Sequence, residues 1–371
     1  MMEKQANTQF TEQQPIDLRG NPLGTDGFEF VEFTAPTEAG INGLKVLFGQ
    51  MGFAEIAKHH HKAVWLYRQG DINFIVNGEV QSQASGFASE HGASVNAIAF
   101  RVHDARAAME HAIGQGAEAC DAQAGPMELN IPAIYGIGGS LIYLVDRYGD
   151  HDIYDVDFTY YPDVAVRLAQ QDAGLLVIDH LTHNVQRGHM DHWAQFYERL
   201  ANFKEIRHFD IKGKMTGLLS RAMTAPCGKI RIPINESHDD KSQIAEYLEQ
   251  YNGEGIQHIA LSTENIFATV TQLQKNGLIF MDTPDTYYEG INKRVPEHHE
   301  DVAKLRALKV LIDGDESGIL LQIFTQTVIG PVFFEIIQRK GNEGFGEGNF
   351  QALFESIELD QIRRGVLKDD S

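Results

Sequence analysis

The chain of 371 residues is 43% hydrophobic and 22% charged with a formal net charge of −21, a globular composition with room for roughly two to three domains. This excess of acidic residues argues against a nucleic-acid partner, because binding a phosphate backbone needs a basic surface. A membrane partner is not expected either, because no run of about 18 apolar residues occurs.

The only cysteines, Cys120 and Cys227, lie far apart and form neither a CxxC motif nor a disulfide framework. That usage indicates a reducing compartment. Residues 1–20 are polar and lack the apolar segment of a secretory signal. We therefore expect a cytoplasmic location.

The first half is expected to comprise a flexible N-terminal arm at 1–26 and an N-terminal domain at 27–153. Apolar alternation and turn signals such as Asn77-Gly78 divide this domain into short elements. In chain order they predict strand 28–33, helix 43–52, strands 63–68 and 71–76, strand 95–102, helix 105–114 and strand 142–145.

The second half repeats this order after an expected linker at 154–172, within a C-terminal domain at 173–371. The same signals predict strand 175–181, helix 192–202, strands 217–220 and 229–233, strand 256–261, helix 266–276 and strand 332–337. Aligning Ala97 with His258 places Gly116 opposite Gly277 without a gap, each closing a helix. We infer two copies of a strand–helix–strand–strand–strand module.

The two copies differ at three aligned positions. The first copy offers Glu32, Ala97 and Tyr143, and the second offers His180, His258 and Glu335. Two imidazoles and one carboxylate are the ligands of a mononuclear non-heme Fe(II) site, which leaves coordination positions open for substrate and O₂.

Each ligand also has an alternative interpretation. The chain contains 16 histidines, so a single one is usually a surface or structural residue. His180 and His258, however, both lie in apolar strands, where a neutral imidazole needs a partner. Glu335 lies in the apolar strand 332–337, where a carboxylate needs a salt bridge or a metal. Since Ala97 offers no ligand atom, we expect one iron per chain.

Other polar clusters are not expected to bind metal or nucleotide. Residues 59–61 are three consecutive histidines, which alternate between strand faces, and we expect a solvated surface there. The cluster 297–300 lies in a polar insertion and is expected to be a loop. His183 faces away from His180 on the strand. Residues 344–348 lack dinucleotide-binding spacing, so we predict no nucleotide site.

Four segments resemble motifs of the 4-hydroxyphenylpyruvate dioxygenases, in the same order along the chain. They are residues 178–185 around His180, 255–260 around His258, 333–339 around Glu335, and 344–350. The resemblance spans about residues 27–357. It implies an α+β fold of two vicinal-oxygen-chelate domains, each an open β-barrel of paired βαβββ modules, followed by a C-terminal helix. The implied cofactor is Fe(II).

The same resemblance implies a substrate pocket of ten residues. They are Ser220, Pro233, Asn235, Gln243, Gln257, Gln322, Phe324, Phe333, Phe345 and Phe350. Asn235 and Gln243 can hydrogen-bond a phenol and are the candidate catalytic residues, whereas the phenylalanines supply apolar walls. Asn235 also fits a simple turn-forming role, and each phenylalanine fits a core.

The implied reaction converts 4-hydroxyphenylpyruvate and O₂ to homogentisate and CO₂, as in tyrosine and phenylalanine catabolism. The alternatives are 4-hydroxymandelate synthase, an extradiol ring-cleaving dioxygenase, and a metal-free binding protein of the same fold. Asn235 and Phe324 favour the ring-hydroxylating reaction by resemblance. The sequence leaves the oligomeric state open, a homo-oligomer included.

The C-terminal segment carries one further expectation. Phe350, Leu353, Phe354 and Ile357 recur at helical spacing after a glycine-rich stretch. The pattern predicts a helix that forms a lid over the iron, with a terminal helix sealing the barrel as the alternative.

Overall fold

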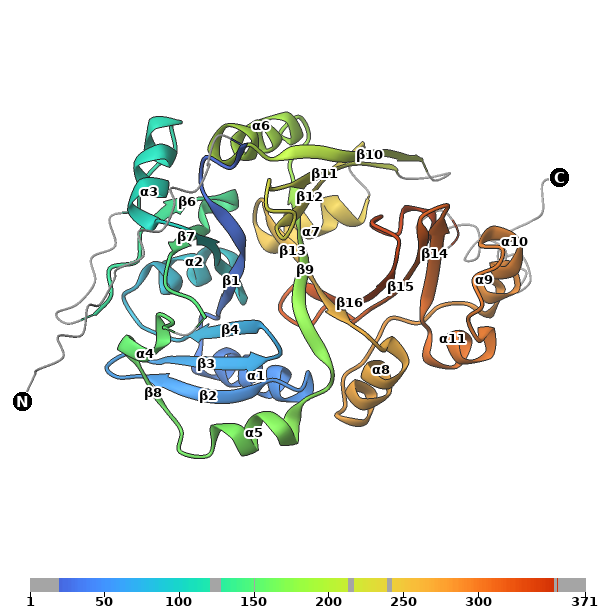
Figure 1. Cartoon of the computed structure of the whole chain (residues 1–371), viewed down its shortest axis with the longest axis horizontal. Helices are drawn as coiled ribbons and strands as arrows, with labels where there is room; N and C mark the ends of the chain where they lie inside the picture. Colours follow the sequence, from blue (N-terminus) through green and yellow to red (C-terminus); the bar gives the residue numbers. More distant parts are fainter. Residues whose placement is uncertain are drawn as a thin grey trace, which may run out of the picture.

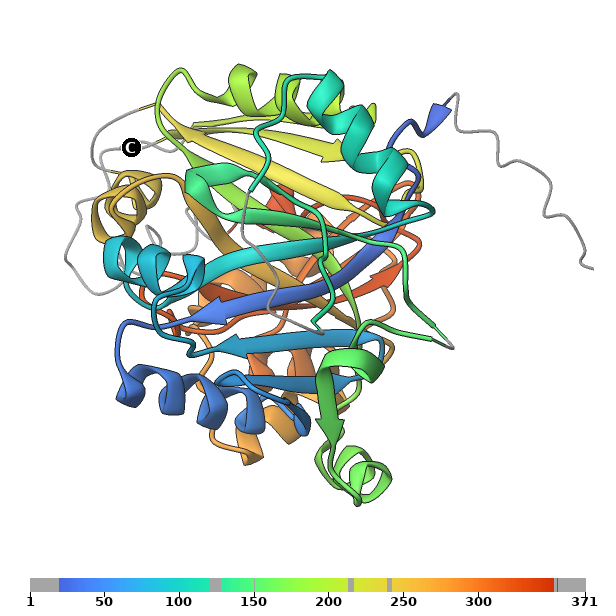
Figure 2. The same cartoon turned by 90° about the vertical axis from the view of Figure 1, so that its left-hand side faces the viewer.

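The computed structural model describes residues 20–120, 128–149, 151–212, 217–238, 242–349 and 352. Its named strands form two eight-stranded sheets, one from each half of the chain (Figure 1). In Figure 2 the strands cross the middle of the molecule and helices lie around its periphery. The structure confirms the expected α+β class.

The first sheet has the strand order β6-β7-β5-β1-β4-β3-β2-β8. Its half of the chain comprises β1 (Thr25–Thr34), α1 (Glu38–Gln50), β2 (Ala54–His59), β3 (Val64–Gln69), β4 (Ile72–Asn77), α2 (Gln83–His91), β5 (Ser94–Val102), α3 (Ala105–Gly114), β6 (Ala133–Tyr135), η2 (Ile137–Gly139), β7 (Leu141–Val145), α4 (Tyr154–Asp157), β8 (Phe158–Tyr160) and α5 (Val164–Gln171).

The second sheet has the order β10-β11-β12-β9-β13-β16-β15-β14. Its half comprises β9 (Leu175–Val185), α6 (Met190–Ala201), β10 (Lys204–Lys212), β11 (Gly217–Thr224), β12 (Arg231–Ser237), α7 (Gln243–Tyr251), β13 (Gly255–Thr263), α8 (Ile266–Lys275), α9 (Asp285–Glu289), α10 (Ile291–Arg294), α11 (Val302–Leu308), β14 (Leu311–Asp315), β15 (Gly318–Phe324) and β16 (Phe333–Lys340).

Each half is built from two modules that meet at an antiparallel pair of central strands. These central pairs are β1–β5 in the first sheet and β9–β13 in the second. Within each module the first strand pairs in parallel with the last, as in β9–β12 and β13–β16. The expected pairing of strand–helix–strand modules is therefore confirmed, and every central strand lies where its inner face can line a barrel.

An aromatic core joins the two sheets. The Phe53 and Phe74 rings stack at 4.3 Å, and Phe33 packs edge-on against Phe74. Phe334 of β16 contacts Phe33 and Phe74 from the other half. Burying each such ring stabilises the fold by about 1.5–3 kcal/mol. Because side chains alternate along a strand, the next residue, Glu335, faces the opposite side of β16.

The register corrects one of the aligned positions. Ala260 pairs with His180 on one side and Glu335 on the other. The matching residue of the first sheet, Ala99, pairs with Phe30 and Tyr143. The prediction that Glu32 matches His180 is therefore wrong, because Phe30 occupies that place. The match of Tyr143 with Glu335 is confirmed.

Several elements differ from the sequence expectation. Helix α3 covers the predicted range 105–114, but β2, α2, β10, α7, β14 and β15 were not predicted. Within the expected linker 154–172, β8 pairs with β2 and α5 follows. Residues 297–300 lie outside helices and strands, as expected, whereas the insertion that contains them also forms α9 and α10.

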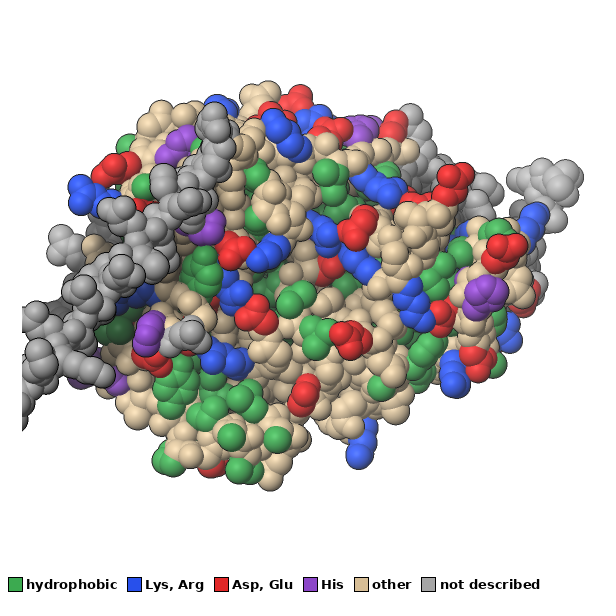
Figure 3. Space-filling view, in the orientation of Figure 1, with side chains coloured by type: hydrophobic (Ala, Val, Ile, Leu, Met, Phe, Trp, Pro, Cys, Tyr) green, Lys and Arg blue, Asp and Glu red, His purple; other side chains and the backbone are tan. Residues whose placement is uncertain are grey.

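Surface charge agrees with the acidic composition. On the face shown in Figure 3, lysine and arginine side chains lie among acidic ones without a continuous basic patch. Among the described residues, no helix has the length and apolar character needed to cross a membrane.

Candidate metal centre

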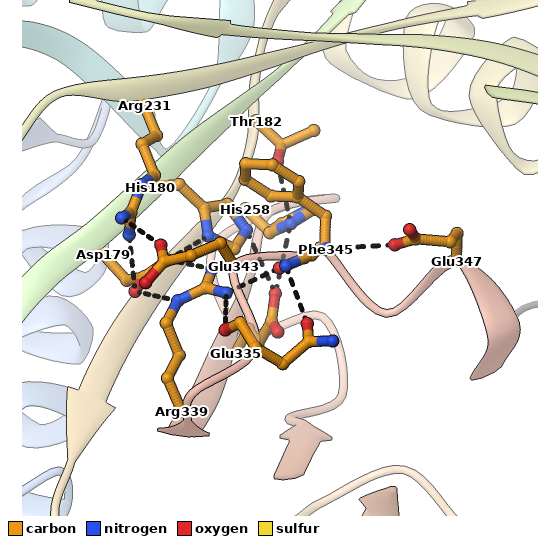
Figure 4. Close-up of polar contacts among 12 residues, drawn as sticks. Asp179, His180, Thr182, Arg231, His258, Glu335, Arg339, Glu343, Phe345 and Glu347 are labelled. Carbon is orange, nitrogen blue, oxygen red and sulfur yellow. Dashed lines mark hydrogen bonds and ion pairs between the residues drawn. The ribbon is translucent and has the colours of Figure 1, made fainter. Parts of the chain in front are cut away.

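Three strands bring His180, His258 and Glu335 together on one inner face. Across the neighbouring strands β13 and β16, Ala260 lies beside Glu335, and His258 lies two residues before Ala260 on the same face. His180 Nε2 lies 3.2 Å from Glu335 Oε2, and His258 Nε2 lies 3.5 Å from it (Figure 4). One ligand atom from each residue falls within 4.8 Å of the others.

The burial and chemistry of this group fit a metal ion. His180 and Glu335 are each 2% exposed and His258 is 7% exposed. Glu335 Oε1 is buried without a hydrogen-bond partner, which is costly for a carboxylate unless a cation neutralises it. Two imidazole nitrogens and a carboxylate oxygen are the donor set of non-heme Fe(II) oxygenases.

Charge interactions within the group favour an ionised carboxylate. Burial opposes ionisation, but the charges and hydrogen bonds of His180 and His258 together outweigh it and lower the pKa of Glu335. Burial also opposes protonation of His180, yet Glu335 raises its pKa. Burial lowers the pKa of His258, which favours the neutral imidazole that a metal requires.

A buried ion network lies behind His180 and orients its ring. His180 Nδ1 lies 2.8 Å from Asp179 Oδ1, so Nδ1–H donates and Nε2 is left to face Glu335. Arg339 donates to both Asp179 oxygens at 2.8 Å, and Arg231 approaches at 3.4 Å. Burial opposes ionisation of Asp179, but Arg339 and His180 together outweigh it and lower the pKa of that carboxyl.

Asp179→Asn is expected to weaken iron binding by roughly 10- to 100-fold, because groups that orient a metal-bound histidine typically contribute that much. Chelator competition for Fe(II) measures the affinity. Glu343→Gln is the matched control, since it removes an exposed partner of Arg231 at the edge of the same network. Wild-type iron affinity in Asp179→Asn would show that the network does not orient the ligand.

Aromatic rings surround the three side chains. The Phe333 ring stacks on His258 with centroids 4.9 Å apart, and Phe345 meets His180 edge-on at 5.2 Å. Phe324 pairs with Glu335 across β15–β16 and contacts the Phe333 ring. The structure thus brings three of the four predicted phenylalanines to the triad of His180, His258 and Glu335. The fourth, Phe350, lies outside the described residues, as does most of the predicted lid helix.

Two predicted glutamines also lie near the triad. Gln257 Oε1 lies 3.0 Å from His258 Nδ1, so it accepts from that ring nitrogen and fixes the tautomer with Nε2 inward. Gln322, two residues before Phe324 on β15, is 1% exposed with a buried Oε1 that has no partner. That oxygen is free to accept a hydrogen bond from a ligand.

The predicted polar residues of the pocket lie on neighbouring strands. Asn235 of β12 pairs with Ser220 of β11, and Pro233 is buried two residues before it. Gln243 is the exposed first residue of α7, and no described contact joins it to the triad. The structure therefore groups Ser220 with Asn235 but does not place Gln243 beside them.

Sequence reasoning missed two residues of this inner face. Thr182 Oγ1 lies 2.9 Å from His258 Nε2. Asn184 is fully buried, pairs with Asn235 across β9–β12, and has both amide atoms without a partner. The alternation His180, Thr182, Asn184 along one strand was the signal that could have found them.

The segment after β16 is held against the site by hydrogen bonds. Arg339 donates to the backbone oxygens of Asn342 and Gly344, just before Phe345. Glu347 pairs with Arg207 of β10 at 2.9 Å. The aromatic ring of Phe345 in this segment therefore closes one side of the His180, His258 and Glu335 group.

His183 lies on the opposite face, as expected. It is fully buried, and its Nε2 lies 2.7 Å from the Tyr197 hydroxyl of α6. By contrast, the expectation that residues 59–61 are a solvated surface is wrong for His59, which is 9% exposed. Its Nδ1 accepts backbone N–H groups of His61 and Lys62, so it terminates β2.

His183 should make the protein less stable in mild acid. Burial lowers its pKa to about 3, whereas in the unfolded chain it is protonated near pH 6.5. Between these values the unfolded chain binds more protons, so stability falls as pH falls. In the wild type this effect should lower the free energy of unfolding by about 2 kcal/mol between pH 7 and pH 5, and His183→Gln should remove that decrease, as measured by urea unfolding. The exposed His192→Gln should retain the wild-type slope, and an equal slope in both variants would contradict the assignment.

This chain is similar to known proteins along almost its whole length. Residues 19–159 match the family model "Hydroxyphenylpyruvate dioxygenase, HPPD, N-terminal", and residues 177–321 match the "Glyoxalase/Bleomycin resistance protein/Dioxygenase superfamily" model. The chain is 68% identical to Hemolysin VllY of Vibrio vulnificus, covering 94% of this chain and 98% of that protein. It is 63% identical to the 4-hydroxyphenylpyruvate dioxygenase of Pseudomonas aeruginosa, covering 94% and 97%.

A solved structure gives the same fold. A variant of 4-hydroxymandelate synthase from Streptomyces coelicolor matches with a TM-score of 0.78 at 25% identity. The match covers 91% of this chain and 99% of that chain. The same fold thus occurs in proteins that are named for different reactions, 4-hydroxyphenylpyruvate dioxygenase and 4-hydroxymandelate synthase.

Proposed function

The chain belongs to the 4-hydroxyphenylpyruvate dioxygenase family, and we propose from this premise that it converts 4-hydroxyphenylpyruvate and O₂ to homogentisate and CO₂. Family members named for this activity match it at 54–63% identity over nearly their whole length. The observation that carries the proposal is the buried His180, His258 and Glu335 group, with one carboxylate oxygen unpartnered.

We propose that these three side chains hold the Fe(II) cofactor, one ion per chain, within a catalytic domain at 173–371. Iron bound there supplies open coordination positions for a 2-oxo acid and for O₂. Asp179 and Gln257 fix the two imidazole tautomers, so each Nε2 faces the ion. The barrel at 27–153 would carry no iron, with 154–172 as the connection. Of the expected arm at 1–26, residues 1–19 lie outside the described residues, and Thr25 already belongs to β1.

The surrounding residues would hold the aromatic ring and exclude water. Phe324, Phe333 and Phe345 supply apolar walls at the triad. Ser220, Asn235 and the buried Gln322 amide offer hydrogen-bond partners for the ring hydroxyl. Holding the ring at a fixed position relative to the metal determines which carbon is hydroxylated.

Product identification tests the proposal. Purified protein with Fe(II), O₂ and 4-hydroxyphenylpyruvate should yield homogentisate and one CO₂ per turnover, measured by liquid chromatography and mass spectrometry. Formation of 4-hydroxymandelate would instead establish the reaction named for the Streptomyces protein. Absence of iron and of turnover in the purified, folded protein would establish a binding protein of the same fold.

The reaction places the protein in tyrosine and phenylalanine catabolism, and we propose that it acts in the cytoplasm. Cys120 and Cys227 are both free thiols in the structure, which supports a reducing compartment. Fractionation of cells that express the native gene, followed by immunoblotting, would locate the protein.

A further inference from the structure

The first sheet borders a half-open cavity of about 190 Å³ on its inner face. It lies among β1, β2, β3, β4, β6, β7, β8 and α4, in the half that lacks the His–His–Glu group (Figure 1). An apolar cavity of about 150 Å³ is enough to admit benzene. The space therefore suits one ring with a short substituent. Residues that define it include Phe30, Glu32, Asn77, Ala133, Tyr143 and Phe158.

This cavity occupies the place that the metal centre occupies in the second sheet. Asn77 pairs with Thr34 as Asn235 pairs with Asn184, so Asn77 matches Asn235. Phe30 and Tyr143 stand where the second sheet has its first histidine and its glutamate, and their rings lie 5.5 Å apart. The first barrel thus retains a lined interior in which aromatic rings replace the metal ligands.

Glu32 is the carboxylate at the centre of this interior. It is 7% exposed, and its Oε1 accepts hydrogen bonds from Asn77 at 3.0 Å and Asn96 at 2.5 Å. No described lysine or arginine forms an ion pair with it, because Lys62 pairs with Glu128 at 2.6 Å. Two neutral amides compensate a buried charge only in part. Burial accordingly raises the pKa of Glu32, and the two amides and the charge of Lys62 oppose that effect.

Lys62 also lines the cavity, and its charge lowers the pKa of Glu32, but its ammonium is paired with Glu128. The other groups of the cavity supply no positive charge. His59 accepts two backbone N–H groups at Nδ1, and burial lowers its pKa, so the ring is neutral. The Asp157 carboxylate accepts from the backbone of Leu129 and adds negative charge. The cavity therefore combines apolar walls with a negative potential.

We propose that the first barrel binds a small organic cation, an ammonium group on a single ring, with the ammonium at Glu32 and the ring against Phe30 and Tyr143. A charge-assisted hydrogen bond would compensate the buried carboxylate, and the ring faces would stabilise the cation further. An inorganic metal ion fits less well. Among the described residues, only the His180, His258 and Glu335 group brings three metal-ligating atoms together.

Benzylamine and benzyl alcohol form a matched pair of probes, since they differ mainly in the charged group. Titrated calorimetrically into the iron-loaded full chain, benzylamine should bind saturably and benzyl alcohol at least about tenfold more weakly. Glu32→Gln keeps the shape and the amide contacts but removes the charge, so it should weaken benzylamine binding by about tenfold or more. Glu343→Gln, an exposed acid on the other half, should leave the affinity unchanged.

A cavity-filling variant and an enzyme assay locate the probe. Ala133→Leu should abolish binding of both probes, with circular dichroism and iron content reporting that the chain is folded. If that variant fails to fold, Glu32→Gln alone decides the question. Benzylamine bound in the first barrel should not compete with 4-hydroxyphenylpyruvate. Competitive inhibition, equal affinity in wild type and Glu32→Gln, or no saturable binding would each overturn the proposal.

Discussion

Replacing His180, His258 or Glu335 with alanine is expected to abolish iron binding and turnover while most of the fold persists. Each variant removes one of three ligand atoms that lie within 4.8 Å of one another. The loss should exceed the roughly 10- to 100-fold effect typical of groups that only orient ligands. Metal analysis after gel filtration and the homogentisate assay measure both quantities.

The first barrel provides the control for this experiment. Phe30, Ala97 and Tyr143 stand at the positions matching the three ligands, and the first two offer no ligand atom. Tyr143→Phe should therefore retain one iron per chain. Two tightly bound iron ions per chain that survive His180→Ala would contradict the assignment, as would wild-type iron in all three alanine variants.

The apolar runs of the sequence predicted the central strands well because these strands are buried on both faces. The strand predicted at 175–181 lies within β9, and that at 256–261 lies within β13. Helix α3 was predicted over its full length, because Asp104 caps its start and Gly116, with a φ of +87°, follows its end. Helices with clear capping residues and strands that are buried on both faces are the elements that a single sequence predicts best.

Edge elements were missed for a physical reason. Strand β10, with the sequence KEIRHFDIK, pairs on one side only and carries charges along its length. Strand β14 contains Asp313, Gly314 and Asp315, which are typical of turns. Their strand conformation is set by pairing with β11 and β15 and not by local propensity.

The misplaced match of Glu32 reflects what alternation alone leaves open. An alternating apolar pattern identifies the two faces of β1 but not which residue of β1 lies opposite Ala99 of β5. The irregular pairing next to Glu32 in β1–β5 and next to His258 in β9–β13 falls at matching places, so it shifts neither match relative to the other. Sequence spacing therefore identified the right strands but not the register at this position.

The site was predicted unevenly for a related reason. His180, His258 and Glu335 are a donor set typical of Fe(II) sites, and they lie in apolar strands, so the sequence alone indicated them. The Asp179–Arg339 network joins residues from β9 and β16, and only the folded barrel brings them together. The Asn184 amide and Gln322 Oε1 indicate a ligand site only because they are buried without a hydrogen-bond partner, which the sequence does not show.

Asn235→Leu is expected to reduce homogentisate formation by roughly 100-fold with iron retained, because a displacement of about 1 Å at a reacting centre costs that much. Asn235 lies on β12 between Ser220 and Asn184, on the face that continues to His180. Removing its amide would take away the proposed hydrogen-bond partner of the ring hydroxyl without changing a described contact of His180, His258 or Glu335. O₂ uptake, CO₂ release and product yield should be measured together.

The ratio of these three quantities separates ring positioning from a structural role. If Asn235 orients the ring, the leucine variant should release CO₂ in excess of homogentisate, since decarboxylation needs only the 2-oxo acid end of the substrate. Asn292→Leu, an exposed substitution of the same kind on α10, should retain wild-type coupling. Unchanged turnover and coupling in Asn235→Leu would mean that Asn235 only shapes β12. A parallel loss of iron would mean that it supports the metal centre instead.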